Sequence, residues 1–162
     1  GVDDVLRYTK KPFVASHSNA RAICPWVRNL TDDMIRKLAE RGGVTGLNFC
    51  GDFLKDPFAG KTSAKERKTA LQEKDTTGYQ TMAGSEATFA DVVRHARHII
   101  NVGGIECIGL GSDFDGIPDY PGRPKADRMD DLAEAFCDAG FTPDEIEHIF
   151  YRNVLRVYHD TL

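Results

Sequence analysis

The stretch FVASHSNARAICPWVRN, residues 13–29, decides the fold, because within it an apolar run stops abruptly at a polar loop. Residues 13–15 follow a proline and form a short apolar run, a pattern typical of the end of a buried parallel strand. Residues 16–19, SHSN, then place polar groups at the carboxyl end of that strand. In parallel α/β proteins this end of the sheet carries the ligand-binding loops. His17 is therefore a candidate functional residue.

Strand-like and helix-like patterns alternate along the rest of the chain. Helices are expected where apolar residues recur at helical spacing, and strands where short apolar runs precede polar residues. The expected helices are residues 2–9, 31–41, 85–103, 130–137 and 142–158, and the expected strands are 13–15, 44–49 and 105–110. Strands that alternate with amphipathic helices form βαβ units around a parallel sheet.

The segment from Lys55 to Gly84 interrupts this alternation with a long polar sequence. It exceeds the usual length of a connection inside a compact domain, so we expect an insertion or long loop over residues 55–84, with a helix around 63–73. A binding loop or lid and a plain surface loop both fit this segment.

Length and charge limit the class of protein. The chain has 162 residues, and a domain of about this size buries roughly 70% of its unfolded surface. Its 25 acidic and 21 basic side chains include no basic stripe, so neither nucleic acid nor an anionic membrane is expected as a partner. No apolar stretch is long enough to span a membrane, and the start GVDDVLRYTKK lacks the apolar core of a signal peptide.

The four cysteines, Cys24, Cys50, Cys107 and Cys137, show neither CxxC pairing nor the spacing of a metal site. Two of them end or interrupt apolar runs, where cysteine packs as a small hydrophobic residue. Buried free thiols and a cytoplasmic location are therefore expected, although four cysteines also permit two disulfides.

His17 and Asp113 hold equivalent positions at the carboxyl ends of two different strands, and such ends gather catalytic groups from distant parts of a chain. The imidazole of His17 suits a divalent metal such as Zn²⁺. Asp113 suits a role as metal ligand or as proton acceptor for an activated water. A hydrogen-bonded structural histidine is the alternative for His17.

Arg28 lies in the loop between His17 and the next helix. A planar guanidinium there suits bidentate capture of a substrate carboxylate. A surface salt bridge to Asp32 or Asp33 is the alternative.

His95 and His98 lie three residues apart in the body of an amphipathic helix. A shared metal is one interpretation of this spacing, but a solvated or interhelical face is favoured because neither residue lies at a strand end.

Six blocks of sequence carry a resemblance: SHSNARAIC, RNLTDDMI, RGGVTGLNF, HARHI, GLGSDFDGI and DEIEHIFYRNVLRVY. They resemble the C-terminal portion of the membrane dipeptidase family, the renal dipeptidase-like zinc metallopeptidases. The resemblance covers nearly the whole chain, follows the order of the family's blocks and is weakest over residues 55–84.

The resemblance implies a (β/α)₈ barrel with two zinc ions at its mouth and hydrolysis of dipeptides by a metal-bridging water. It implies that His17 is a zinc ligand and that Arg28 binds the free carboxylate of the substrate. Asp113 matches the aspartate near the bridging water, which handles the proton. Phe53 matches a pocket-lining aromatic residue, and Trp26 occupies a variable loop position with an open role.

The remaining metal ligands of the family, a His-x-Asp pair, a bridging Glu and a further His, would precede Gly1. The expected fold is therefore α/β, the C-terminal part of a (β/α)₈ TIM-type barrel with about three β/α units and C-terminal helices. Residues 1–162 are expected to form a portion of one metallo-dependent hydrolase domain, incomplete as a barrel on its own. The expected partners are a dipeptide substrate and either the N-terminal half of the same enzyme or a second copy of the chain.

Two other functions remain open from the sequence. The chain fits an inactive fragment that pairs its sheet edges with itself or a partner, or a related amidohydrolase that acts on a lactam or amide. Arg28 discriminates the latter, because a substrate without a free carboxylate leaves the guanidinium nothing to bind.

Overall fold

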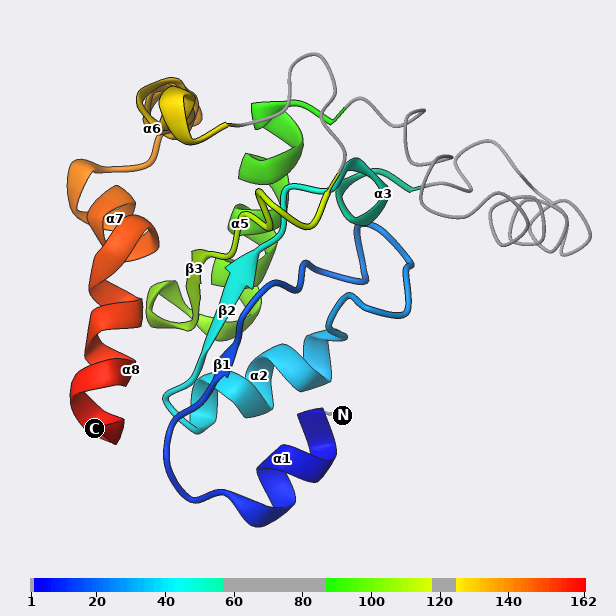
Figure 1. The fold of residues 1–162 in the computed structure, drawn as a ribbon, viewed down its shortest axis with the longest axis vertical. Coiled ribbons are helices and arrows are strands. Elements are labelled where there is room, and N and C mark those ends of the chain that lie inside the picture. Colours follow the sequence, from blue (N-terminus) through cyan, green and yellow to red (C-terminus); the bar gives the residue numbers. More distant parts are fainter. Residues whose placement is uncertain (1, 57–86, 118–124) are drawn as a thin grey trace, which may run out of the picture.

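A computed structural model describes residues 2–56, 87–117 and 125–162. The predicted insertion at 55–84 therefore lies outside the described residues, apart from Lys55 and Asp56, and so does the predicted helix at 63–73. The elements in chain order are α1 Val2–Tyr8, β1 Val14–Ala15, α2 Asp32–Glu40, β2 Val44–Leu47, α3 Gly51–Leu54, α5 Phe89–Gly103, η2 Ile105–Cys107, β3 Ile108–Leu110, η3 Ala126–Arg128, α6 Met129–Asp138, α7 Pro143–Glu147, η4 His148–Arg152 and α8 Asn153–Thr161 (Figure 1).

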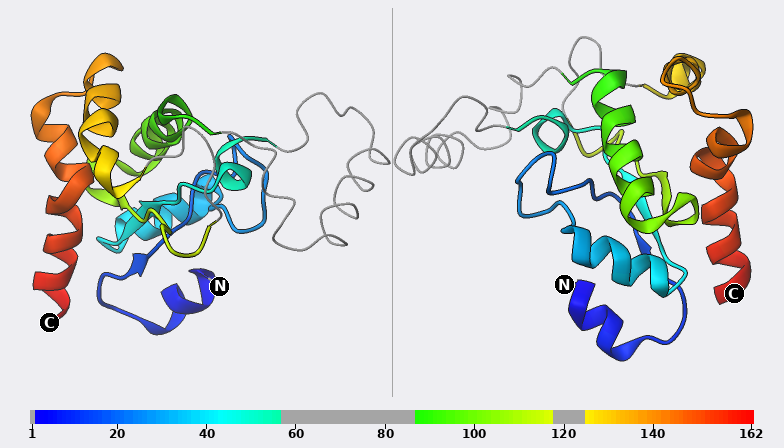
Figure 2. Two further views of the ribbon diagram at one scale, coloured as in Figure 1. Left: turned by 45° about the horizontal axis from the view of Figure 1, so that its top comes forward. Right: turned by 180° about the vertical axis from the view of Figure 1, so that it is seen from behind.

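The described strands form one parallel sheet in the order β1-β2-β3. Val14 is in register with Val44, and Gly46 is in register with Gly109. Helix α2 connects β1 to β2, and α5 precedes β3, so the predicted alternation of strands and helices is confirmed (Figure 2). The buried strand predicted at residues 13–15 is wrong in one respect: β1 lies at the edge of the described sheet, and Val14 is 40% exposed.

All three strands are shorter than predicted, and β2 and β3 are shortened by local hydrogen bonds. Strand β2 ends at Leu47 because the amide of Asn48 leaves the ladder and donates to the side-chain oxygen of Asn19 at 2.9 Å. The strand predicted at 105–110 begins with a 3₁₀ turn, in which the amide of Cys107 donates to the carbonyl of Gly104 at 3.2 Å. Only Ile108–Leu110 is extended.

The helix boundaries follow the capping signals in the sequence. Thr31 caps α2 by accepting a hydrogen bond from the amide of Met34, and a capping box joins Thr142 to Glu145 at the start of α7. The single helix predicted over 142–158 is continuous but contains a π-helical turn between α7 and α8. After that turn, the buried Asn153 donates hydrogen bonds to the carbonyls of Ile105 and Ile108.

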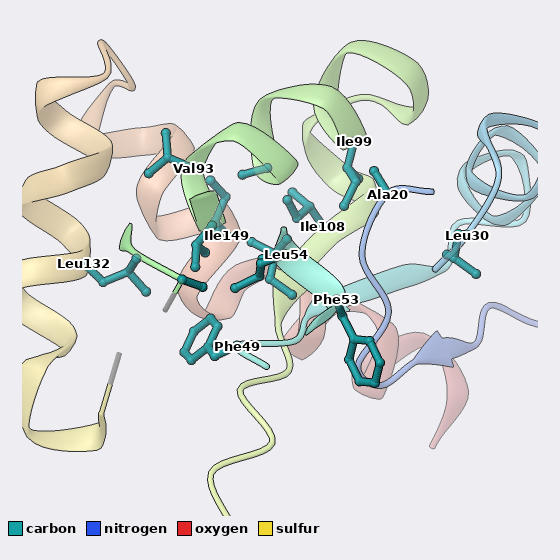
Figure 3. Packing of buried hydrophobic residues seen from close by; sticks show 14 of the residues in the cluster. Ala20, Leu30, Phe49, Phe53, Leu54, Val93, Ile99, Ile108, Leu132 and Ile149 are labelled. Carbon is teal, nitrogen blue, oxygen red and sulfur yellow. The ribbon is translucent and has the colours of Figure 1, made fainter. Parts of the chain in front are cut away.

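The hydrophobic core joins all three β/α units. Its side chains come from the sheet, from α2, α3, α5 and α6, and from the π-helical turn; Figure 3 labels Phe49, Leu54, Ile99, Ile108, Leu132 and Ile149 among them. In that view the ring of Phe53 is turned away from Ile99 and Ile108. Within the described residues, no helix has both the length and the apolar character needed to cross a membrane.

The four cysteines all lie in the described part of the chain, and no disulfide joins them. Cys24, Cys50 and Cys107 are buried as predicted, whereas Cys137 is exposed on α6. Burial raises the pKa of the Cys107 thiol to about 11, so this thiol remains protonated at neutral pH.

Candidate active site

Because the strands are parallel, the carboxyl ends of all three lie at the same end of the sheet. His17 follows β1 and Asp113 follows β3, and the chain passes very close to itself between them. A Cβ atom added to Gly111 would lie 2.1 Å from the carbonyl oxygen of Ser16 and 3.0 Å from the Cα of His17. The strand ends that carry His17 and Asp113 are therefore packed directly against each other, as the sequence predicts.

Arg28 lies against the imidazole of His17. Arg28 Nη2 is 2.6 Å from His17 Nε2, and His17 Nδ1 is 2.6 Å from the hydroxyl of Ser16. Because a guanidinium only donates, Nε2 accepts, and the proton of the neutral imidazole lies on Nδ1. The alternative partners of Arg28 are engaged elsewhere: Asp32 pairs with His98 and Asp33 pairs with Lys37.

Phe53 and Trp26 form the aromatic side of the site. The guanidinium carbon of Arg28 lies 5.1 Å from the ring centroid of Phe53, within the range of a cation–π contact. The rings of Trp26 and Phe53 are 6.2 Å apart and tilted by 37°. The structure thus brings Phe53, predicted to line the pocket, together with Arg28 and His17.

The loop that carries Arg28 is closed at its base by main-chain pairing. Ala20 and Leu30 form an isolated parallel bridge, and the amide of Leu30 donates to the carbonyl of Asn19 at 2.8 Å. The buried side chain of Asn29 donates to the carbonyl of Phe53 at 2.9 Å. Residues 20–30, which we call the Arg28 loop, are therefore anchored to helix α3.

Asn48, at the end of β2, is a site residue that the sequence analysis missed. Its side-chain amide donates to Asp113 Oδ2 at 3.0 Å, and its main-chain amide donates to Asn19. Asn48 lies within the strand predicted over residues 44–49, and only the earlier end of β2 at Leu47 places it beyond the carboxyl end of a strand, so its position in the sequence did not identify it. Asp113 itself has a φ of +66°, the only such value for a non-glycine residue in the described ranges.

His95 and His98 have separate roles. His98 pairs with Asp32 of α2 at 2.8 Å, which confirms the interhelical interpretation for this residue. His95 is fully buried and lies against Leu54 of α3, so of the two expected alternatives the interhelical face is confirmed and the solvated face is wrong. Its Nδ1 accepts from the amide of Ala20, and its Nε2 lies 3.0 Å from the carbonyl of Leu54.

A metal centre needs more donors than the described residues bring together. His17 offers one imidazole whose Nε2 is in the acceptor form, which suits one metal bond. Catalytic zinc sites use about three protein ligands. In ranges 2–56, 87–117 and 125–162, no three His, Cys, Asp or Glu side chains are close enough together to hold an ion. The described residues therefore do not fit a metal centre by themselves.

Comparison with known proteins identifies relatives over the whole chain. The family model described as "Membrane dipeptidase (Peptidase family M19)" matches residues 1–161. An uncharacterized dipeptidase from Schizosaccharomyces pombe is 34% identical over 160 residues, which cover 98% of this chain and 32% of that protein. The dipeptidase AclJ of Aspergillus oryzae is 31% identical over 157 residues, covering 96% of this chain and 31% of that protein.

Solved structures show the same relationship. A metallopeptidase from Rhodobacter sphaeroides, crystallised with a phosphinate mimic of the dipeptide L-Ala-D-Ala, superposes with a TM-score of 0.78 at 31% identity. The match covers 100% of this chain and 40% of that chain. This chain thus spans less than half the length of these relatives, and its β/α units correspond to part of a (β/α)₈ barrel, as predicted.

Proposed function

Because this chain belongs to the membrane dipeptidase family, peptidase family M19, we propose that it supplies the carboxylate-binding and proton-transfer side of a dipeptide-hydrolysing site. The family match confirms the resemblance carried by the sequence blocks. Since the chain spans about a third to a half of its curated relatives, the activity is assigned to the larger enzyme of which these residues are a part.

The convergence of Arg28, His17 and Phe53 is the observation that carries this proposal. The three side chains come from different segments and meet at the carboxyl edge of the sheet. A guanidinium has five N–H donors in a planar fork, which matches the two oxygens of a carboxylate. In our proposal Arg28 binds the free carboxylate of a dipeptide, beside the ring of Phe53.

We assign the proton transfer of the hydrolysis to Asp113. A carboxylate at this position accepts a proton from the attacking water and then delivers it to the leaving amine nitrogen. The hydrogen bond from Asn48 fixes one oxygen of the carboxylate, Oδ2. Such a fixed orientation lowers the entropy cost of reaching the transition state.

The family is one of metallopeptidases, and we propose zinc as the metal. If bound, a zinc ion would supply an acidified water and would polarise the scissile carbonyl. His17 is the residue of this chain that we assign to it, through Nε2; the hydrogen bond that Arg28 donates to Nε2 would give way to the metal, which would leave the Arg28 donors to the substrate carboxylate. We assign the other ligands to an N-terminal half that the chain does not span, present on the same polypeptide or as a separate chain.

The test compares a dipeptide with its C-terminal amide, using the complete enzyme. We expect hydrolysis of the dipeptide, a kcat/KM at least about 100-fold lower for the amide, and loss of activity on chelation. Equal hydrolysis of the amide would remove the carboxylate role of Arg28 and favour an amidohydrolase of different specificity. Two zinc ions and full turnover in the isolated 162-residue chain would contradict the assignment of the other ligands.

A further inference from the structure

His95 is a buried histidine that contacts two site-bearing segments at once. It lies in α5 and its side chain is 0% exposed. Its Nδ1 accepts a hydrogen bond from the amide of Ala20, and its Nε2 donates to the carbonyl of Leu54, both at 3.0 Å. A carbonyl only accepts and an amide N–H only donates, so the imidazole is neutral with its proton on Nε2.

The two residues that His95 contacts lie in the segments that carry Arg28 and Phe53, the residues proposed to form the carboxylate site. Ala20 forms the base of the Arg28 loop by pairing with Leu30. Leu54 directly follows Phe53, whose ring lies under the Arg28 guanidinium. One imidazole therefore links the base of the loop to the turn that carries the aromatic ring.

We propose that His95 is a positioning residue, which holds the Arg28 loop and the Phe53 turn in register so that a dipeptide carboxylate meets a preformed site. This inference rests on the proposed function of Arg28. An apolar residue of similar size would fill the same volume, but it would leave the buried amide of Ala20 without its partner and the carbonyl of Leu54 with only the 3.3 Å hydrogen bond from Arg94. The imidazole forms a hydrogen bond with each of these groups and fixes the distance between them.

Three substitutions in the complete enzyme test this role. His95→Leu removes both hydrogen bonds, His95→Asn keeps an acceptor near the amide of Ala20, and His95→Gln keeps a donor near the carbonyl of Leu54. His98→Asn is the matched control, because His98 lies on the same helix but pairs with Asp32 instead. The readouts are KM and kcat for a dipeptide, and hydrogen exchange of amides 18–30.

For His95→Leu we expect a KM raised about tenfold with kcat changed less than about threefold, since the change loosens binding geometry rather than the proton-transfer group. Amides 18–30 are expected to exchange faster. His95→Asn restores protection of these amides and most of the KM, and His98→Asn leaves both as in the wild type. If His95→Leu does not fold, His95→Gln takes its place: it lacks the acceptor for the amide of Ala20 and should raise KM and speed exchange at 18–30, whereas His95→Asn should do neither.

The positioning role would be overturned if His95→Leu left KM or the exchange of amides 18–30 unchanged. It would also be overturned if His98→Asn had an equal effect. The two proposals fail separately. A wild-type enzyme that hydrolyses no dipeptide would contradict the proposed function, while exchange at 18–30 would still decide whether His95 holds the loop.

Discussion

The side-chain amide of Asn48, at the end of β2, donates a hydrogen bond to Asp113 Oδ2, at the end of β3, over 3.0 Å. Asn48 is fully buried, and its side-chain oxygen accepts from the amide of Cys50 at 2.7 Å. The amide group is thus held in one orientation from both ends. It presents a donor to the carboxylate that we assign to proton transfer.

Replacing Asn48 by leucine should lower kcat of the complete enzyme about tenfold or more, with a smaller change in KM, because Asp113 loses a fixed orientation. Steady-state kinetics with a dipeptide measures this. Asn48→Asp should be worse, since it places a second carboxylate beside Asp113. A kcat within about twofold of the wild type in both variants would show that the hydrogen bond has no part in the chemistry.

Replacing Arg28 by alanine should raise KM for dipeptides strongly, with kcat/KM falling about 10- to 100-fold, as expected for a lost hydrogen bond to a charged group. The same variant should bring the kcat/KM values of a dipeptide and its amide close together. Arg21→Lys is the matched control, because Arg21 donates to carbonyls of the same loop, Val27 and Asn29. An unchanged KM for Arg28→Ala would remove its assigned role.

Burial lowers the pKa of His95 to about 4 from an ordinary value of 6.5. The hydrogen bond to the carbonyl of Leu54 opposes this shift, as does Asp91 on the same helix. Arg94 and His98, also on α5, lower the pKa further. The folded protein thus keeps His95 neutral over a pH range in which the unfolded chain is protonated.

The free energy of unfolding should therefore fall as pH decreases from 6.5 to 4, because the unfolded state binds the extra proton in this window. The contribution is fully present above about pH 6.5, and roughly 3 kcal/mol of it is lost by about pH 4. Urea unfolding at several pH values measures the slope. His95→Asn should flatten it, and a slope equal to that of the wild type in this variant would contradict the assignment.

Gly111 should tolerate no side chain, because a Cβ would lie 2.1 Å from the Ser16 carbonyl, and both atoms belong to packed strand ends. Gly111→Ala should cost about 3 kcal/mol of unfolding free energy or more and should reduce activity by displacing His17. Gly104→Ala is the control: nothing lies within 4 Å there, but φ is +85°. It should cost only about 1 kcal/mol. Denaturant unfolding measures both costs, and equal costs for Gly111→Ala and Gly104→Ala would contradict the close contact at Gly111.

Much of the architecture follows from local sequence. Helix starts such as those at Thr31 and Thr142 were predictable because a capping side chain bonds an amide about one turn away. The positions of His17 and Asp113 were predictable because each lies within three residues of the end of an apolar strand, and their roles stay predictions. The strand ends at Leu47 and Ile108 were not, since they depend on where a neighbouring segment or a preceding turn takes the backbone hydrogen bonds.

The sequence by itself therefore determined the alternation of strands and helices, the family, and the residues placed at the sheet edge. Only the tertiary structure decided which groups hold those residues in place. Asn48 and Asp113 are 65 residues apart in the chain, and His95 lies 75 residues from Ala20. Hydrogen bonds over such separations depend on the packing of α5 and the sheet into one core, and no periodicity or capping pattern along the chain encodes them.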